Sequence, residues 1–583
     1  MPDEAPSTSL VHARPATEPE WWRSAVIYQI YPRSWADGNG DGVGDLPGIT
    51  DRLPYLRDLG VDAIWLSPFY VSPQADAGYD VADYRDIDPI FGTLGDADTL
   101  LATAHDLGLK VIVDLVPNHS SDEHPWFQAA LAAGPGSPER ARYIFRDGLG
   151  PNGDLPPNNW LCVFGGAAWT RTKANGDTDG QWYLHLFDPK QPDFDWENPE
   201  VRAEFEDVLR FWLDKGVDGF RVDVANALIK EAGLPNWDEP LHILGDADGM
   251  PHDHHGTKPP MWDQDGVHEI YRAWRRILNS YNPIGADGYS GDNDRILCAE
   301  AWVDSQERAV RYVRQDEMHQ AFNFEFLQTQ WRAGDLRAVI TTSFTAADSV
   351  GAPTTWVLSN HDVVRHSSRL GLPVGTKRPN GIGVGDPQPD AVLGLRRARA
   401  ATALMLALPG SSYLYQGEEL GLPDSTDMPD DVRQDPAWSR GNHTERGRDG
   451  CRVPMPWEGD RPSYGFGPSE LTWLPQPQSY AALAVDRQIG VDGTTLELYR
   501  ALLATRRTHG LGTGSLSWVE GYAEDVLAFV NEPDAGPSVL VITNVGPTPV
   551  AVPHGATMLL SSGPLTAEGL VPADTTVWLT GRP

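Results

Sequence analysis

Short apolar runs alternate with longer amphipathic stretches along most of the chain. Eight runs have the length and composition of buried strands, at residues 25–31, 63–66, 111–116, 217–222, near 296, 321–326, near 356 and 412–416. Helical spacing, often followed by Gly or Pro, occurs at residues 53–59, 98–107, 201–215, 267–278, 305–314, 336–344, 391–407 and 495–506. Strands that alternate with helices form parallel sheets with right-handed crossovers. The pattern therefore predicts an α/β fold, a (β/α)8 TIM barrel.

Three parts of the chain depart from this alternation. After His119 the pattern lapses for about 65 residues rich in Gly, Pro and aromatics, which indicates a small domain inserted after the third strand. From about residue 510, short strands separated by turns predict a C-terminal antiparallel β-sandwich. We expect a loose N-terminal tail to about residue 20, barrel at 1–119 and 185–508, the insert at 120–184 and the β domain at 509–583.

Charged residues follow three of the predicted strands. Arg221 and Asp223 alternate with apolar neighbours, so a period of two places both on one face. Glu300 ends a second apolar run, and His361 and Asp362 end a third. An isolated Arg–Asp pair would favour a structural salt bridge, but stability does not require acids at the same end of three strands. Because the active site of a barrel forms at the C-terminal ends of its strands, we expect these residues around one pocket.

Composition and charge narrow the possible partners and the compartment. The chain has 46 basic and 82 acidic residues, a formal net charge of −36, which argues against nucleic acid and anionic membranes as partners. Its three Cys residues form no CxxC motif, so a reducing compartment is favoured over a disulfide framework. The N-terminus lacks the basic and apolar regions of a signal peptide, and no apolar run reaches about 18 residues. We expect a cytoplasmic protein.

A loop after the first predicted strand has the spacing of a calcium-binding loop. Oxygen side chains occupy its positions 1, 3, 5 and 9, position 7 can offer a carbonyl, and Gly42 stands where the loop must turn sharply. Position 12 is Gly48 in place of the Glu of a full EF-hand, and a plain Gly/Asp turn is the alternative. We expect a structural Ca2+ or Mg2+ ion, and no organic cofactor, with ligands Asp37, Asn39, Asp41, Val43 and Asp45. A second loop, 235–260, contains His252, His254 and His255, which we expect to be solvated.

Four segments resemble the signature regions of the α-amylase family of glycoside hydrolases, in the family's order. They are DLVPNH at 114–119, GFRVD at 219–223, AE at 299–300 and SNHD at 359–362. The segments QPDFD at 191–195 and RVPMPW at 452–457 resemble markers of the α-glucosidase and oligo-1,6-glucosidase subgroup, with departures at Phe194 and Asp195.

This resemblance implies a role for each matching residue. Asp223 would be the nucleophile, Glu300 the general acid/base and Asp362 the stabiliser of the transition state. Arg221 would orient Asp223 and keep it ionised. The resemblance also implies a sugar-binding set: Tyr79 as a stacking platform, Asp76 paired with Arg452 at the far hydroxyls, His119 and His361 at other hydroxyls, and Phe164 and Phe187 at the entrance.

The chemistry is that of a retaining glycosidase. One carboxylate attacks the anomeric carbon and one acid protonates the leaving oxygen, with the two about 5–5.5 Å apart. The nucleophile must be ionised and the acid protonated near neutrality. The Asp76–Arg452 pair that the resemblance implies would close the pocket beyond the first sugar. A pocket closed in this way favours exo action on short oligosaccharides.

We expect an α-glucosidase acting on maltose and short malto-oligosaccharides, with transglucosylation possible. The competing hypotheses are an oligo-1,6-glucosidase, which the resemblance implies through Val224 because Val after the nucleophile accompanies α-1,6 preference in part of the subgroup, and a sucrose- or trehalose-acting transferase or isomerase. A non-catalytic binding subunit is disfavoured because all three acids are present. A barrel enzyme that uses the Asp37–Asp45 ion catalytically is disfavoured because that cage looks closed.

Overall fold

The structure is a computed structural model that describes residues 7–14, 20–174, 177–238, 258–282, 294–373, 375–376 and 379–581. His252, His254 and His255 lie outside the described residues. Eight parallel strands form the central sheet, in the order β12-β11-β10-β6-β3-β2-β14-β13. A parallel bridge between Phe322 and Thr355 joins the two ends of this order, which closes the sheet. The predicted (β/α)8 barrel is confirmed. Its strands are β2 (Val26–Ile30), β3 (Ala63–Leu66), β6 (Lys110–Leu115), β10 (Gly219–Val222), β11 (Ile296–Ala299), β12 (Gln320–Ala321), β13 (Thr355–Val357) and β14 (Ser411–Tyr415).

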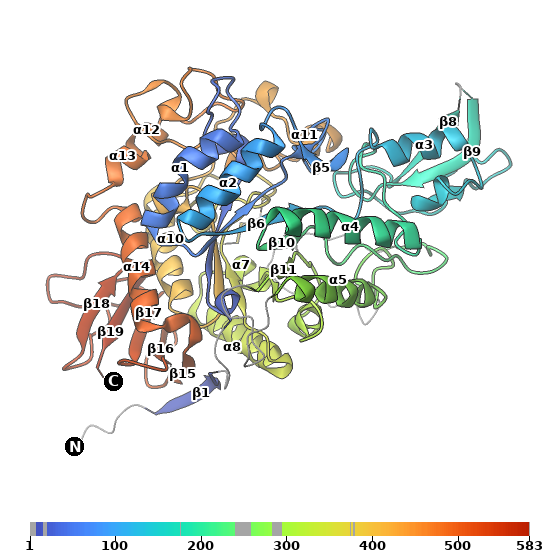
Figure 1. Cartoon of the computed structure of the whole chain (residues 1–583). Coiled ribbons are helices and arrows are strands. Elements are labelled where there is room, and N and C mark those ends of the chain that lie inside the picture. Colours follow the sequence, from blue (N-terminus) through green and yellow to red (C-terminus); the bar gives the residue numbers. More distant parts are fainter. Residues whose placement is uncertain are drawn as a thin grey trace.

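Helices surround the barrel, as Figure 1 shows. The long ones are α1 (Leu46–Leu59), α2 (Leu94–Asp106), α4 (Pro199–Lys215), α5 (Val267–Tyr281), α8 (Ala333–Val350), α10 (Ala391–Leu406) and α14 (Thr495–His509). Their ends follow local sequence: the Asn198 side chain accepts the Glu200 N–H at the start of α4, and Gly216 ends it in the left-handed conformation. Shorter helices are α6 (Gln306–Ala309), α9 (His366–Arg369), α11 (Pro436–Arg440), α12 (Tyr480–Leu483) and α13 (Val485–Gln488).

The alternation of side chains along the strands divides the core in two. Val26 and Ile30 of β2 pack in the large cluster between sheet and helices, whereas Ile27 packs with Trp65 and Tyr413 in a smaller cluster. The members of this smaller cluster come from successive barrel strands, so it fills the barrel interior.

The sixth strand is shorter than the sequence pattern predicts. Only Gln320–Ala321 pairs with β11, and a helix, α7 (Phe324–Gln328), follows at once. The side chain of Asn323 accepts the Phe326 N–H and so begins this helix. Phenylalanines at every second position from 322 to 326 imitate a strand, which is why the predicted strand 321–326 is wrong.

The segment between β6 and α4 forms the expected small insert. It contains α3 (Pro125–Ala133) and a three-stranded antiparallel sheet of β7 (Phe145–Asp147), β8 (Trp169–Ala174) and β9 (Asp177–Leu184). Figure 1 shows it projecting from one side of the barrel. A further two-stranded sheet, β4 (Tyr70–Val71) and β5 (Asp83–Ile87), lies between β3 and α2 in the sequence.

The C-terminal part is an antiparallel β domain, as expected, but its strands form one six-stranded sheet in place of a sandwich. Its order is β1-β15-β16-β17-β19-β18, from β1 (Thr8–His12), β15 (Ser515–Val519), β16 (Val526–Glu532), β17 (Val539–Asn544), β18 (Thr557–Ser561) and β19 (Thr575–Thr580). One face packs on α10, where Trp578 Nε1 donates to the Ala403 carbonyl at 2.9 Å. On the other face, Ile542 and Leu579 pack against apolar residues of the sheet's own loops, such as Val552.

The sequence suggested a loose N-terminal tail, but part of this tail forms a strand. Residues Thr8–His12 pair with β15 at the edge of the C-terminal sheet (Figure 1). The Ser and Pro content of the tail gave no sign of this five-residue strand, because pairing with the distant strand β15 stabilises it. No helix in the described part of the chain is long and apolar enough to cross a membrane.

Candidate active site

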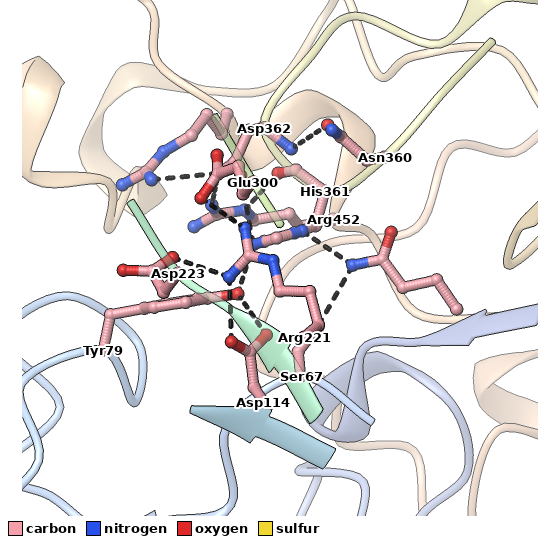
Figure 2. Close-up of polar contacts among 12 residues, drawn as sticks. Ser67, Tyr79, Asp114, Arg221, Asp223, Glu300, Asn360, His361, Asp362 and Arg452 are labelled. Atoms are coloured by element: carbon pink, nitrogen blue, oxygen red, sulfur yellow. Dashed lines mark hydrogen bonds and ion pairs between the residues drawn. The ribbon is translucent and has the colours of Figure 1, made fainter. Parts of the chain in front are cut away.

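Arg221 is the centre of a buried charge cluster at the C-terminal end of the barrel. It stands in register with Asp114 of β6, so both side chains point into the barrel at the same level. Its Nη1 lies 2.8 Å from Asp114 Oδ1 and 2.6 Å from Asp223 Oδ1, and its Nη2 lies 2.7 Å from Glu300 Oε2. Figure 2 shows the guanidinium between these three carboxylates. The structure thus brings together the residues that the strand ends predicted.

Asp223 and Glu300 each follow directly on a strand, β10 and β11. The next residue, Val224, has φ of 42°, a left-handed conformation that is strained for a β-branched side chain. In this conformation its N–H donates to Glu300 Oε2 at 3.0 Å. The indole Nε1 of Trp302 donates to the other oxygen, Oε1, at 3.1 Å. The candidate nucleophile and the candidate acid are therefore linked by backbone as well as by Arg221.

Tyr79 and His361 form a stacked pair on one side of the cluster. Their ring centroids are 5.4 Å apart with an interplanar angle of 6°. The Tyr79 hydroxyl donates to Asp114 Oδ2 at 3.1 Å and lies 2.6 Å from His361 Nε2. Gln29 Nε2 donates to His361 Nδ1 at 2.7 Å, which leaves the His361 proton on Nε2, facing Tyr79 and, at 3.2 Å, Asp362 Oδ2. Both rings are thereby held in one orientation.

The closed end of the pocket is built by Arg448, whereas the sequence pointed to Arg452. Asp76 Oδ1 lies 2.7 Å from Arg448 Nη2, and Arg448 also contacts Asp362 Oδ1 at 3.1 Å and Asp435 Oδ2 at 2.6 Å. The expected Asp76–Arg452 pair is wrong. Arg452 Nη2 contacts Asp362 Oδ1 at 3.0 Å and its Nε donates to the His361 carbonyl at 2.8 Å, so it supports Asp362 from behind. Arg448 lines the pocket itself.

The QPDFD segment, noticed in the sequence only as a family marker, contacts the site. Gln191 Nε2 donates to Asp76 Oδ2 at 3.2 Å and lies 3.2 Å from His119 Nε2. Asp193 Oδ2 accepts from Asn118 Nδ2 at 3.2 Å. The segment therefore fixes His119 against the pocket wall.

The pocket lies over this cluster and is open at one end. Phe164 and Phe187, expected at the entrance, line it with their rings in an edge-to-face contact at 5.9 Å. Sequence reasoning missed several lining residues: Asn226, Lys258, Trp262, Asp263, Asn380 and Arg448. Most follow strand ends in irregular segments, where no periodicity distinguishes them; only the position of Asn226, three residues after Asp223, was a usable signal.

The cluster has more buried carboxylates than cations to balance them. Burial raises the pKa of Asp114 to about 7, although Arg221 opposes the shift. Burial, with the charges of Glu300 and Asp114, also raises the pKa of Asp223 well above its usual range, again against Arg221. Arg221 thus favours the ionised form of Asp223, as the resemblance implies, whereas burial and the neighbouring carboxylates oppose it.

Asp362 has the opposite environment. Burial disfavours its charge, but His361 and the guanidiniums of Arg448 and Arg452 outweigh burial and hold the pKa of Asp362 below its usual range. Burial lowers the pKa of His119 to about 4, so that ring is neutral at neutral pH. The site thus combines one carboxyl whose pKa is lowered, that of Asp362, with two whose pKa values are raised, those of Asp114 and Asp223.

The loop proposed to bind a cation has hard oxygen donors that fit Ca2+ or Mg2+. Asp37, Asn39, Asp41 and Asp45 are all within one turn-rich loop, and Asp37 and Asp45 are buried. Their oxygens accept loop N–H groups: Gly40 and Gly42 donate to Asp37 at 2.6 and 2.8 Å, and Gly48 donates to Asp45 at 2.7 Å. Within the described ranges no three His, Cys, Asp or Glu side chains form a metal cluster. The ion stays a prediction.

Comparisons with known proteins give a consistent picture. The alpha amylase catalytic domain family matches residues 29–513. A "Probable alpha-glucosidase" of Rhizobium meliloti (strain 1021) is 40% identical over 86% of this chain and 85% of its own. An "Oligo-1,6-glucosidase" of Parageobacillus thermoglucosidasius is 35% identical over 84% of each. The crystal structure of the "alpha-glucosyl transfer enzyme" XgtA superimposes with a TM-score of 0.80 and 36% identity, over 97% of this chain and 100% of its own. The chain therefore belongs to the α-amylase family and is a glycoside hydrolase.

Proposed function

We propose that this glycoside hydrolase is an exo-acting, retaining α-glucosidase that releases terminal glucose from maltose and short malto-oligosaccharides. The observation that carries the proposal is the contact of one guanidinium, Arg221, with both Asp223 and Glu300. Two carboxylates on one guanidinium are close neighbours, as a retaining mechanism requires. The activity of the relatives, by their names, supports the same substrate class.

In the proposed mechanism, the Asp223 carboxylate attacks the anomeric carbon while Glu300 protonates the departing oxygen. A covalent glucosyl-Asp223 intermediate results. Glu300, now ionised, then takes a proton from water as the water oxygen bonds to the same carbon and releases Asp223. Asp362 stays charged and lies where positive charge develops on the sugar ring.

Exo action rests on the closed end of the pocket. The Asp76–Arg448 pair is polar, with Asp76 buried and the Arg448 side chain 12% exposed, so it suits the hydroxyls of a single terminal glucose and blocks a longer chain from passing. Tyr79 presents a ring for the apolar face of that sugar. Phe164 and Phe187 would line the path of the leaving sugar.

Transglucosylation is a second candidate, favoured by the similarity to an enzyme named for alpha-glucosyl transfer. A second sugar and water would compete for the same intermediate. A preference for α-1,6 linkages, which Val224 favours, and action on sucrose or trehalose are further candidate activities of the same pocket.

The test is glucose release from maltose, isomaltose, sucrose and trehalose by the purified protein, with Asp223→Asn in parallel. We expect release from maltose, lost in the variant. New disaccharides with little free glucose would favour transfer or isomerisation, and absence of turnover of all four would refute the proposal.

We further propose that Asp37, Asn39, Asp41, Asp45 and the Val43 carbonyl hold a structural Ca2+ or Mg2+. The ion would stabilise the loop between β2 and α1 and take no part in the chemistry. A cytoplasmic location stays a prediction from the sequence; the three Cys residues are buried and unpaired, which agrees with it.

A further inference from the structure

Glu300 has an unequal set of donors on its two oxygens. Oε2 receives two, Arg221 Nη2 at 2.7 Å and the Val224 N–H at 3.0 Å. Oε1 receives the Trp302 indole N–H at 3.1 Å and, among the described residues, no second donor. A carboxylate oxygen accepts about two hydrogen bonds, so Oε2 is filled and Oε1 has one position left.

We propose that Trp302 is a positioning residue that presents Oε1 of Glu300 as the atom that gives and takes the catalytic proton. This inference rests on the proposed glucosidase function. The proton occupies the open position on Oε1. As the bond between the anomeric carbon and the leaving oxygen breaks and Asp223 bonds to that carbon, the proton passes from Oε1 to the leaving oxygen. The three N–H donors then stabilise the Glu300 carboxylate, which takes its proton back from water in the second step.

Trp302 is itself held rigidly. Its ring stacks on Phe324 with centroids 3.7 Å apart and an interplanar angle of 1°, and its carbonyl accepts from Asn226 Nδ2 at 2.6 Å. Phe324 is in turn the first residue of α7, fixed by the Asn323 cap. A rotamer locked by such packing keeps the indole N–H aimed at Oε1 through the reaction, as orientation of a catalytic group requires.

The strained backbone at Val224 serves the same carboxyl. Its left-handed conformation points the N–H at Oε2, and the next residue, Ala225, donates its N–H to the Glu300 carbonyl at 2.7 Å. The two residues Val224 and Ala225 therefore fix the Oε2 atom and the backbone carbonyl of Glu300. Among the described residues, Trp302 is the one donor to the other oxygen, Oε1.

The test is Trp302→Phe, which keeps an aromatic ring on Phe324 and removes the N–H. The two substrates are maltose, whose leaving sugar must be protonated, and α-glucosyl fluoride, whose leaving group needs little protonation. We expect kcat/KM to fall about 10–100-fold on maltose and less than about threefold on the fluoride. The matched control is Trp518→Phe in the C-terminal sheet, which removes an indole N–H that donates to Thr341 of α8 and should change kcat/KM on neither substrate.

A double-mutant cycle separates positioning from a general structural role. In a Glu300→Gln background, Trp302→Phe should lower maltose turnover no further, because the group it positions is already lost. Phe324→Leu loosens the Trp302 indole and keeps its N–H, so it should lower kcat/KM on maltose by a smaller factor and kcat/KM on the fluoride by less still. This variant replaces Trp302→Phe in the test if Trp302→Phe does not fold. Equal falls on both substrates, or no fall on maltose, would overturn the proposal. If the wild type turns over neither substrate, the proposed function fails and this inference fails with it.

Discussion

Arg448 links Asp76 to Asp362: its Nη2 lies 2.7 Å from Asp76 Oδ1 and its Nη1 lies 3.1 Å from Asp362 Oδ1. One guanidinium thus couples the residue proposed to bind the far hydroxyls with the residue proposed to stabilise the transition state. Asp435 contacts the same guanidinium. Burial disfavours the charge of Asp435, but Arg448 and Arg452 outweigh burial and lower the pKa of Asp435 to about 2. The pocket's closed end is therefore a continuous network of ion pairs.

Arg448→Gln should lower kcat/KM on maltose by about 100-fold or more, because it leaves buried carboxylates unpaired and the pocket's end disordered. The measurement is steady-state kinetics with maltose. Arg461→Gln, in the same irregular segment but with a largely exposed side chain, is the control and should behave as wild type. Near-normal kinetics of Arg448→Gln would contradict the assignment of the closed end.

Val224→Thr should raise activity on the α-1,4 linkage of maltose relative to the α-1,6 linkage of isomaltose. Threonine has the same branched shape, so it keeps the left-handed backbone and the N–H to Glu300 and changes only a methyl group into a hydroxyl at the pocket wall. One added hydrogen bond corresponds to about a threefold to tenfold change in the ratio of kcat/KM for maltose to that for isomaltose. A ratio equal to that of the wild type would show that Val224 does not set linkage preference here.

Glu418→Gln should stabilise the protein increasingly as pH rises. Glu418 begins a short 3-10 helix three residues after the end of β14, and burial raises the pKa of its carboxyl to about 8. The folded state therefore holds a proton that the unfolded state has lost, and the stability of the wild type falls as pH rises from about 4.5 to 8. Glutamine carries no titrating carboxyl, so the variant does not lose this stability as pH rises. Thermal unfolding at pH 5 and pH 8.5 should show a Tm advantage of about 2–5 °C at the higher pH only. An advantage that shrinks with pH would contradict the sign.

Removal of divalent cations should lower thermal stability if the loop 37–45 binds an ion. Thermal unfolding with chelator, then with added Ca2+ or Mg2+, is the measurement; we expect a Tm lower by several degrees with chelator, restored by the preferred ion. Asp41→Ala, whose side chain bonds only within the loop, should remove the response to the ion. A Tm that is unaffected by chelator would refute the site.

Much of the fold and the catalytic centre could be predicted because both depend on local signals. The barrel follows from apolar runs alternating with helical stretches, and Asp223 and Glu300 stand immediately after two such runs. Burial of charge at the ends of apolar strands is costly without a function, which is why these residues could be found.

The errors concern relationships between distant parts of the chain. Arg448 lies 372 positions from its partner Asp76, in a segment without periodicity, and Arg452 is of the same residue type only four positions further on. Thr8–His12 is a strand only because β15 offers it an edge. At 321–326, alternating phenylalanines suggested a strand, but the Asn323 cap began a helix after two paired residues.

The stereochemistry of the first product tests the central claim, that Asp223 and Glu300 act as nucleophile and acid/base of a retaining glucosidase. Proton NMR of the glucose released from α-glucosyl fluoride, whose leaving group is not itself glucose, distinguishes the outcomes if it is recorded before the anomers interconvert. We predict that the α-anomer appears first and that Asp223→Asn releases none. First appearance of the β-anomer would contradict a covalent glucosyl-Asp223 intermediate.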